Sequence, residues 1–108
     1  MFQLIDYRTE EGRIPLKDWL SRLADRQARA RVEVRLQRMV FGNFGDCKPV
    51  GDGVFELRID HGPGYRVYYS RVGEQLLLLL IGGDKRKQAN DIDTAILYLK
   101  DWQRRTRS

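Results

Sequence analysis

Basic residues and a tyrosine recur at alternating positions in two neighbouring segments of this sequence. Residues 54–60 (VFELRID) and 65–71 (YRVYYSR) alternate apolar and polar side chains, as strands with one buried face do. Pairing of these strands would bring Arg58, Arg66 and Tyr68 together on the polar face. Arginine binds phosphates and an aromatic ring stacks on a base, so this face is predicted to bind nucleic acid. An ordinary solvated sheet face is the alternative.

A run of basic residues follows the most apolar segment of the chain. Residues 76–81 (LLLLLI) are apolar on both faces, as in a central strand, and Gly82-Gly83 is expected to end it. The residues that follow should lie at the rim of the sheet, near the arginines. A solvated loop is the alternative for part of this run. We predict nucleic-acid-binding roles for Arg58, Tyr65, Arg86 and Lys87.

The residue types present are compatible with RNA cleavage that needs no metal ion. RNA carries its own nucleophile, the 2′-hydroxyl, so the protein must supply a base, an acid and phosphate stabilisation. Arg66 is expected to stabilise the scissile phosphate, with Lys85 as a second phosphate contact or proton donor. Tyr68 would stack on a base or position the 2′-hydroxyl, and His61, the one histidine, is the reserve candidate for general base. We predict no metal and no cofactor, because no metal-ligand spacing or phosphate-binding glycine loop is present.

The composition favours a polyanionic partner. Twenty Lys and Arg against fifteen Asp and Glu give a net charge of +5 and an isoelectric point near 9.7. The apolar fraction of 42% is that of a folded protein, and 108 residues suffice for one domain, 1–108. A lone Cys47, an N-terminus without a basic apolar leader and the shortness of the 76–81 segment predict a cytoplasmic protein without membrane contact.

The apolar periodicity predicts an α+β domain with the element order β-α-α-β-β-β-α. Expected strands cover 2–8, 54–60, 65–71 and 76–81. Helices are expected to begin at Pro15, after the cap Asp25 and at the cap Asn90. The segment 42–53 is expected to be a loop, 61–64 a turn and 104–108 a frayed tail. A small, mainly antiparallel sheet would carry the N-terminal helical hairpin on the face opposite Arg66, with a C-terminal helix. The predicted core residues are Trp19, Leu20, Leu36, Leu57, Val67, Leu78, Leu80 and Ile96.

Three phrases at these separations carry a family resemblance. Residues 53–59 (GVFELRI), 62–69 (GPGYRVYY) and 82–85 (GGDK), with Gln88 and Asp91-Ile92 behind them, resemble the bacterial addiction-module killer proteins. These are close to the HigB toxins of the RelE/ParE superfamily, whose element order is similar to the one predicted. The resemblance implies that Arg66 matches a phosphate-contacting arginine and that Lys85 and Arg86 fall where further basic site residues lie. This chain departs from RelE-type nucleases at Phe55 and Glu56, where they carry lysines.

The same resemblance implies three alternatives for function. RelE-like relatives cleave mRNA in the ribosomal A site without a metal, and this reading is favoured. ParE-like relatives instead poison DNA gyrase without cutting nucleic acid, which is the second reading. A degenerate toxin or a basic binding module is the third. The first two imply a cognate antitoxin as partner, and the first adds mRNA and the ribosome. Trp102 or the helical hairpin could also form the face of a homodimer.

Overall fold

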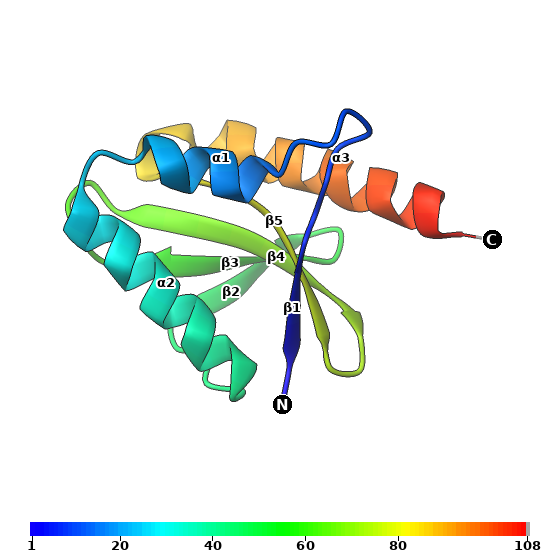
Figure 1. The fold of residues 1–108 in the computed structure, drawn as a ribbon, viewed down its shortest axis with the longest axis horizontal. Coiled ribbons are helices and arrows are strands. Elements are labelled where there is room, and N and C mark those ends of the chain that lie inside the picture. The colour runs from blue at the N-terminus through cyan, green and yellow to red at the C-terminus, as the bar shows by residue number, and fades with distance from the viewer. Residues whose placement is uncertain (108) are drawn as a thin grey trace.

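A five-stranded sheet forms the centre of the computed structural model, which describes residues 1–107 (Figure 1). The strands lie in the order β1-β5-β4-β3-β2. Neighbouring strands are antiparallel, except that β1 runs parallel to β5. The fold is therefore α+β with a mainly antiparallel sheet, as predicted. The strands are β1 (Gln3–Asp6), β2 (Cys47–Gly51), β3 (Val54–Ile59), β4 (Tyr65–Gly73) and β5 (Leu76–Asp84).

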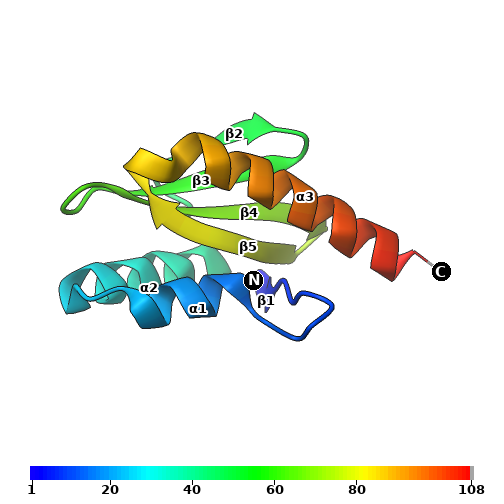
Figure 2. The same cartoon turned by 90° about the horizontal axis from the view of Figure 1, so that it is seen from above.

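Helices cover both faces of this sheet. The N-terminal hairpin of α1 (Pro15–Arg22) and α2 (Arg26–Val40) lies on one face, and α3 (Gln88–Thr106) lies on the other (Figure 2). Asp25 caps α2 as predicted, because its carboxylate accepts hydrogen bonds from the backbone N–H groups of Gln27 and Ala28. No helix among residues 1–107 is long and apolar enough to cross a membrane.

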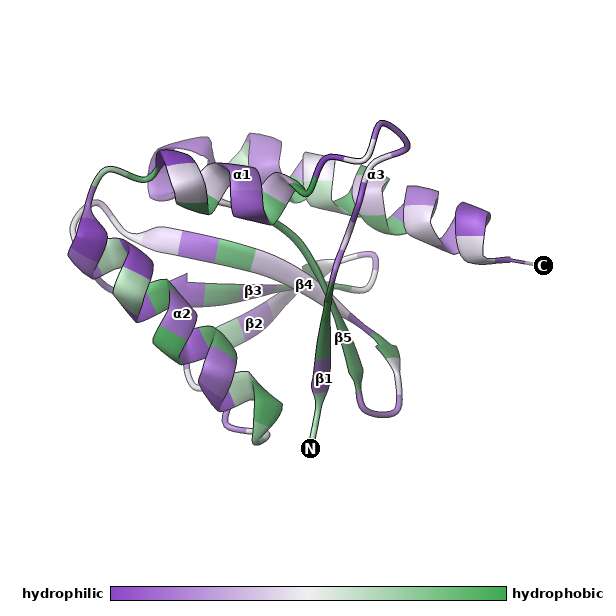
Figure 3. Ribbon diagram, viewed as in Figure 1, coloured by the Kyte–Doolittle hydropathy of each residue, from purple (hydrophilic) through white to green (hydrophobic). Residues whose placement is uncertain are grey.

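The alternation of side chains along the strands divides the core into two halves. Leu57 and Val67 pack under α1 and α2, whereas Leu78 and Leu80 pack under α3. Figure 3 shows apolar residues along most of β5, which is covered on both faces. All four residues were predicted to be buried and are. The other predicted core residues are only half-buried and pack against the edges of the two halves: Trp19, Leu20, Leu36 and Ile96.

The predicted loop 42–53 is wrong in part, because β2 forms within it and pairs with β3. Pro49 is tolerated there because β2 is an edge strand. A tight turn joins β2 to β3 and places Asp52 at a φ of +52° between two glycines of positive φ. Five residues without alternating hydrophobicity gave no strand signal.

The junction between β5 and α3 also differs from the prediction. Gly82-Gly83 does not end β5, which continues to Asp84. A single 3-10 turn, η1 (Lys85–Lys87), follows, and Asp84 caps it by accepting a hydrogen bond from the Arg86 N–H. The helix then begins at Gln88, so Asn90 lies inside α3 and does not cap it.

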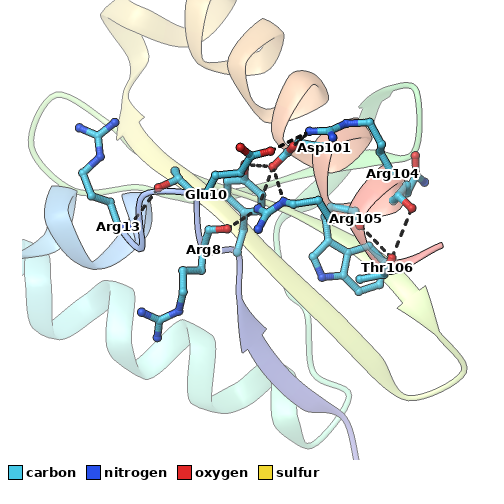
Figure 4. Close-up of polar contacts among 11 residues, drawn as sticks. Arg8, Glu10, Arg13, Asp101, Arg104, Arg105 and Thr106 are labelled. Atoms are coloured by element: carbon cyan, nitrogen blue, oxygen red, sulfur yellow. Dashed lines mark hydrogen bonds and ion pairs between the residues drawn. The ribbon is translucent and has the colours of Figure 1, made fainter. Parts of the chain in front are cut away.

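The predicted frayed tail 104–108 is helical up to Thr106, while Ser108 lies outside the described residues. An ion pair and a hydrogen bond hold this last turn against the segment that follows β1 (Figure 4). Arg104 pairs with Glu10, and Arg105 pairs with Asp101 and donates to the backbone carbonyl of Arg8. Tyr7 also donates a 2.5 Å hydrogen bond to Asp101, so the C-terminal part of α3 is tied to the segment that follows β1.

Candidate functional site

Two arginines lie directly opposite each other on adjacent strands. Arg58 on β3 pairs in register with Arg66 on β4. Like charges at such a position repel unless a counter-charge lies between them. Glu56, two residues before Arg58 on the same face, provides it: its Oε1 lies 3.2 Å from Arg58 Nε and 3.5 Å from Arg66 Nε. Its side chain is fully buried, so both ion pairs are shielded from solvent on the carboxylate side.

The second oxygen of Glu56 joins two further elements. Oε2 accepts hydrogen bonds from the Tyr68 hydroxyl at 3.2 Å and from Gln88 Nε2 at 2.7 Å. A buried carboxylate needs such donors to offset the loss of hydration. The result is one polar cluster under the start of α3 that binds β3, β4 and α3 together. Its residues are Glu56, Arg58, Arg66, Tyr68 and Gln88.

The two arginines open into a pocket of about 360 Å³ at the end of the sheet. Lys85 and the carboxylates Asp46 and Asp60 also line this arginine pocket, together with the 62–64 turn. Gly64 closes its wall: a Cβ there would lie 3.3 Å from Arg66 Nη1, and its φ of +87° favours glycine. Lys85 N–H donates a 2.9 Å hydrogen bond to the Gly64 carbonyl, which fixes Lys85 beside the turn.

Arg66 retains hydrogen-bonding capacity inside the pocket. Its side chain is only 11% exposed, and its buried Nε has no hydrogen-bond partner among residues 1–107. The contact with Glu56 therefore acts through charge, and the one hydrogen bond that the guanidinium donates within residues 1–107 is long, 3.4 Å to the Tyr65 carbonyl. Because Nε is buried against Glu56, an incoming phosphate oxygen would meet the terminal Nη groups of this preorganised guanidinium.

Both tyrosines predicted to contact nucleic acid are buried, and these two predictions are corrected. Tyr68 does share a face with Arg58 and Arg66, but α3 covers that part of the face and leaves the side chain fully buried. Burial and the neighbouring Glu56 raise the pKa of the Tyr68 hydroxyl far above its usual range. Tyr65 points to the other face, where its ring centroid lies 6.1 Å from that of Trp19. Neither ring is accessible for stacking on a base.

His61 contacts the helical hairpin and does not line the arginine pocket. Its Nε2 lies 3.0 Å from Asp25 Oδ2, and its ring stacks against Tyr65. The hydrogen bond from His61 lowers the pKa of the Asp25 carboxyl, which also caps α2. His61 therefore fastens the 61–64 turn to the start of α2, and the reserve role as general base at Arg66 does not fit this geometry.

The three basic residues of η1 point to different places. Lys85 lines the arginine pocket, as predicted for a residue that acts beside Arg66. Arg86 is 81% exposed and pairs with Asp84 at 2.9 Å, which lowers the pKa of that carboxyl. Lys87 lines a different pocket, next to Asp91. Of the residues predicted for the site, the structure thus brings together Arg58, Arg66 and Lys85.

Gly82 and Gly83 set the position of this basic turn. A Cβ at Gly82 would lie 2.3 Å from the ring of Trp19 on α1, and one at Gly83 would lie 1.9 Å from Asp91 Oδ2 on α3. The two glycines therefore allow α1 and α3 to approach opposite faces of β5 just before Lys85. The role of the two glycines is to permit this close packing, and neither of them ends β5.

Sequence reasoning missed Glu56 as the centre of the site. Its place two residues before Arg58 was a usable signal, because i and i+2 share a face of a strand. Asp46 and Asp60, the carboxylates of the arginine pocket, are potential proton acceptors next to the cations. Gln88 could not be found, since its contact depends on where α3 begins. Within residues 1–107 no group of three His, Cys, Asp or Glu side chains is placed to hold a metal ion.

Comparison with known proteins places this chain beside a bacterial relative. No family model matches the sequence. An uncharacterized protein of Haemophilus influenzae is 51% identical over 83 residues, which cover 77% of this chain and 84% of the relative. Identity of this extent over most of both chains means that the chain belongs to the same protein family as this Haemophilus influenzae protein.

Proposed function

We propose that this chain is the toxin of a bacterial type II toxin–antitoxin module, of the RelE/ParE superfamily and close to HigB. In this proposal it is a cytoplasmic, metal-independent, ribosome-dependent mRNA endoribonuclease. The observation that carries the proposal is the convergence of Arg58, Arg66 and Lys85 on one pocket, over a buried carboxylate. Basic residues that merely face solvent need no such fixed arrangement, whereas a site that stabilises a phosphate does.

The pocket contains the groups that transesterification of RNA requires. A carboxylate, Asp46 or Asp60, accepts the proton of the 2′-hydroxyl as its oxygen attacks the adjacent phosphorus. Arg66 and Arg58 stabilise the charge on the phosphate oxygens in the transition state. The bond from phosphorus to the 5′-oxygen breaks, and Lys85 donates a proton to that oxygen. The products are a 2′,3′-cyclic phosphate and a 5′-hydroxyl end.

The proposal also names the partners that would bind at the arginine pocket. An antitoxin that neutralises the toxin would place acidic side chains on Arg58, Arg66 or Lys85 and so block access of mRNA. The ribosome would supply the bound mRNA. Tyr68 and His61 have structural roles in this revised mechanism, because one is buried and the other is paired with Asp25.

A second candidate function is supported by a separate surface. Val34 and Phe41 on and just after α2 are 49% and 72% exposed, and they line an apolar pocket of about 730 Å³. Exposed apolar residues beside a pocket are typical of protein-binding surfaces. A non-nucleolytic toxin that inhibits a protein such as DNA gyrase would use this surface and need no arginine pocket.

The test is primer extension on mRNA from cells that express the chain, with the Arg66→Ala variant and an Arg29→Ala control. Arg29 is half-buried on α2, lies outside the arginine pocket and carries the same charge. We expect discrete mRNA ends from the parent and the control, and about a hundredfold fewer from the Arg66 variant. Growth arrest without such ends would reject the nuclease and favour the protein target.

A further inference from the structure

A second polar pocket lies at the free edge of β5. β1 pairs with β5 only as far as Leu79, and beyond it no strand among residues 1–107 covers that edge. There α1 and α3 flank a pocket of about 190 Å³, which we call the edge pocket. The residues of the edge pocket that matter here are Arg13, Trp19, Arg22, Lys87, Asp91 and Tyr98.

Two aromatic side chains form fixed walls of the edge pocket. Trp19 lies against Gly82, where a side chain could not fit, and contacts Tyr65. Tyr98 stacks on Tyr7 with ring centroids 4.6 Å apart. Such immobilised rings can bind another flat ring at little entropic cost, as in proteins that bind single-stranded nucleic acid.

Three cations of the edge pocket have no counter-ion. Arg13, Arg22 and Lys87 form no ion pair with any residue from 1 to 107. Arg13 extends from the loop that the end of α3 holds in place, and its guanidinium points away from the ion pairs there (Figure 4). They outnumber the two carboxylates that line the pocket, Asp18 and Asp91. The pocket thus combines aromatic walls with a net positive charge, which suits a nucleotide.

Asp91 adds a group that can distinguish bases. The residue is 6% exposed and lines the edge pocket. Its Oδ2 packs against Gly83 and has no hydrogen-bond partner in the described part of the chain. The carboxylate can accept a hydrogen bond from the N4–H of cytosine or the N6–H of adenine, the exocyclic amino groups that uracil lacks. Uracil offers one N–H between two carbonyl oxygens, and these oxygens repel a carboxylate.

We infer that the edge pocket binds a nucleotide of the RNA strand held in the arginine pocket, and that Asp91 makes it prefer an amino-bearing base over uracil. The part of this inference in which one RNA strand occupies both pockets rests on the proposed nuclease function. Lys85 lines the arginine pocket and Lys87 lines the edge pocket. The two residues are about 4 Å apart along the axis of one 3-10 turn, and Arg86 is exposed between them. A single strand can therefore cross η1 and contact both pockets.

Binding of mononucleotides tests the pocket without any cleavage. In a Trp102→Phe background Trp19 is the one tryptophan left, and it reports directly on the edge pocket. We expect CMP to quench its fluorescence at about tenfold lower concentration than UMP. Asp91→Asn should remove this preference, and the exposed Asp93→Asn control should keep it. Equal binding of CMP and UMP to the parent, or no quenching by either, would overturn the inference even if the Asp91 variant does not fold.

A short oligonucleotide with one cytidine among uridines then tests whether one RNA strand occupies both pockets. Arg66→Ala should weaken binding of the oligonucleotide about tenfold and leave CMP binding unchanged. Unchanged oligonucleotide binding would mean that the edge pocket takes free nucleotides only, against the inference. If the parent produces no mRNA ends in cells while it prefers CMP and Arg66 contributes to oligonucleotide binding, the nuclease proposal fails and RNA binding by the edge pocket stands.

Discussion

Gln88, the first residue of α3, donates a 2.7 Å hydrogen bond to the carboxylate of Glu56 in the middle of β3. The same carboxylate contacts Arg58 and Arg66 through its other oxygen. The start of α3 and the two guanidinium groups are therefore held by one buried residue. Helix packing and the geometry of the arginine pocket should change together when that residue is altered.

The first prediction concerns Glu56→Gln. The amide keeps the shape of the side chain but leaves Arg58 and Arg66 adjacent without a counter-charge. Loss of one partner in a buried ion pair costs about 3 kcal/mol in the free energy of unfolding, and cleavage should fall as well. Denaturant unfolding measures the first effect and primer extension the second. Glu74→Gln, an exposed change in the turn after β4, is the control. Equal stability of the two variants would contradict the assigned role.

Arg66→Ala should lower both activity and stability. An exposed strand arginine would contribute little to stability, but Arg66 is not exposed. The side chain is only 11% exposed and balances Glu56, so we now expect a loss of about 2 kcal/mol in unfolding free energy. Arg66→Lys keeps the charge and should recover most of the stability but little of the activity, because lysine lacks the planar fork. Full activity in the lysine variant would show that charge alone suffices.

The fold was more predictable from the sequence than the site. Alternation in β3 and β4 correctly placed Arg58 and Arg66 opposite the helical hairpin. The same pattern could not reveal that α3 returns over that face and buries Tyr68, because this contact joins segments far apart in the chain. Gly82-Gly83 was read as a break, since a glycine pair in sequence gives no sign of the side chains packed against it. The local sequence pattern specified the sheet face on which each side chain lies. Whether that side chain is exposed depended on tertiary packing.

Tyrosine ionisation should make the protein lose stability at high pH. Burial and the hydrogen bond to Asp101 raise the pKa of Tyr7 from 10.0 to about 12. A raised pKa in the folded state means that this contribution is complete below the unfolded value of 10.0 and is lost as pH rises towards 12. Thermal unfolding from pH 8 to 11.5 should show a steeper fall for the parent than for Tyr7→Phe. Parallel curves would show that the hydroxyl is not buried against Asp101.

Gly83→Ala should destabilise the fold through a contact with one residue. The new methyl group would lie 1.9 Å from Asp91 Oδ2, and forced overpacking of this kind costs about 3 kcal/mol. The cost should be smaller in an Asp91→Ala background, where the opposing carboxylate is absent. Gly73→Ala, whose nearest neighbour is 3.2 Å away, is the control for a strand glycine. Equal costs in both backgrounds would mean that the strain arises elsewhere on β5.

Asp91→Asn should stabilise the protein at neutral pH. The Asp91 carboxyl is buried without a partner for Oδ2, and desolvation raises its pKa above the ordinary 3.8. Above the folded-state pKa the ionised group opposes folding, and as pH falls towards 3.8 that penalty disappears. The isosteric amide never carries the charge, so the variant should exceed the parent in unfolding free energy at pH 7 and converge with it near pH 4. Denaturant unfolding at the two pH values, with Asp93→Asn as the exposed control, measures the difference. A variant less stable than the parent at pH 7 would show that Lys87 and the N-terminus of α3 stabilise the carboxylate more than burial opposes it.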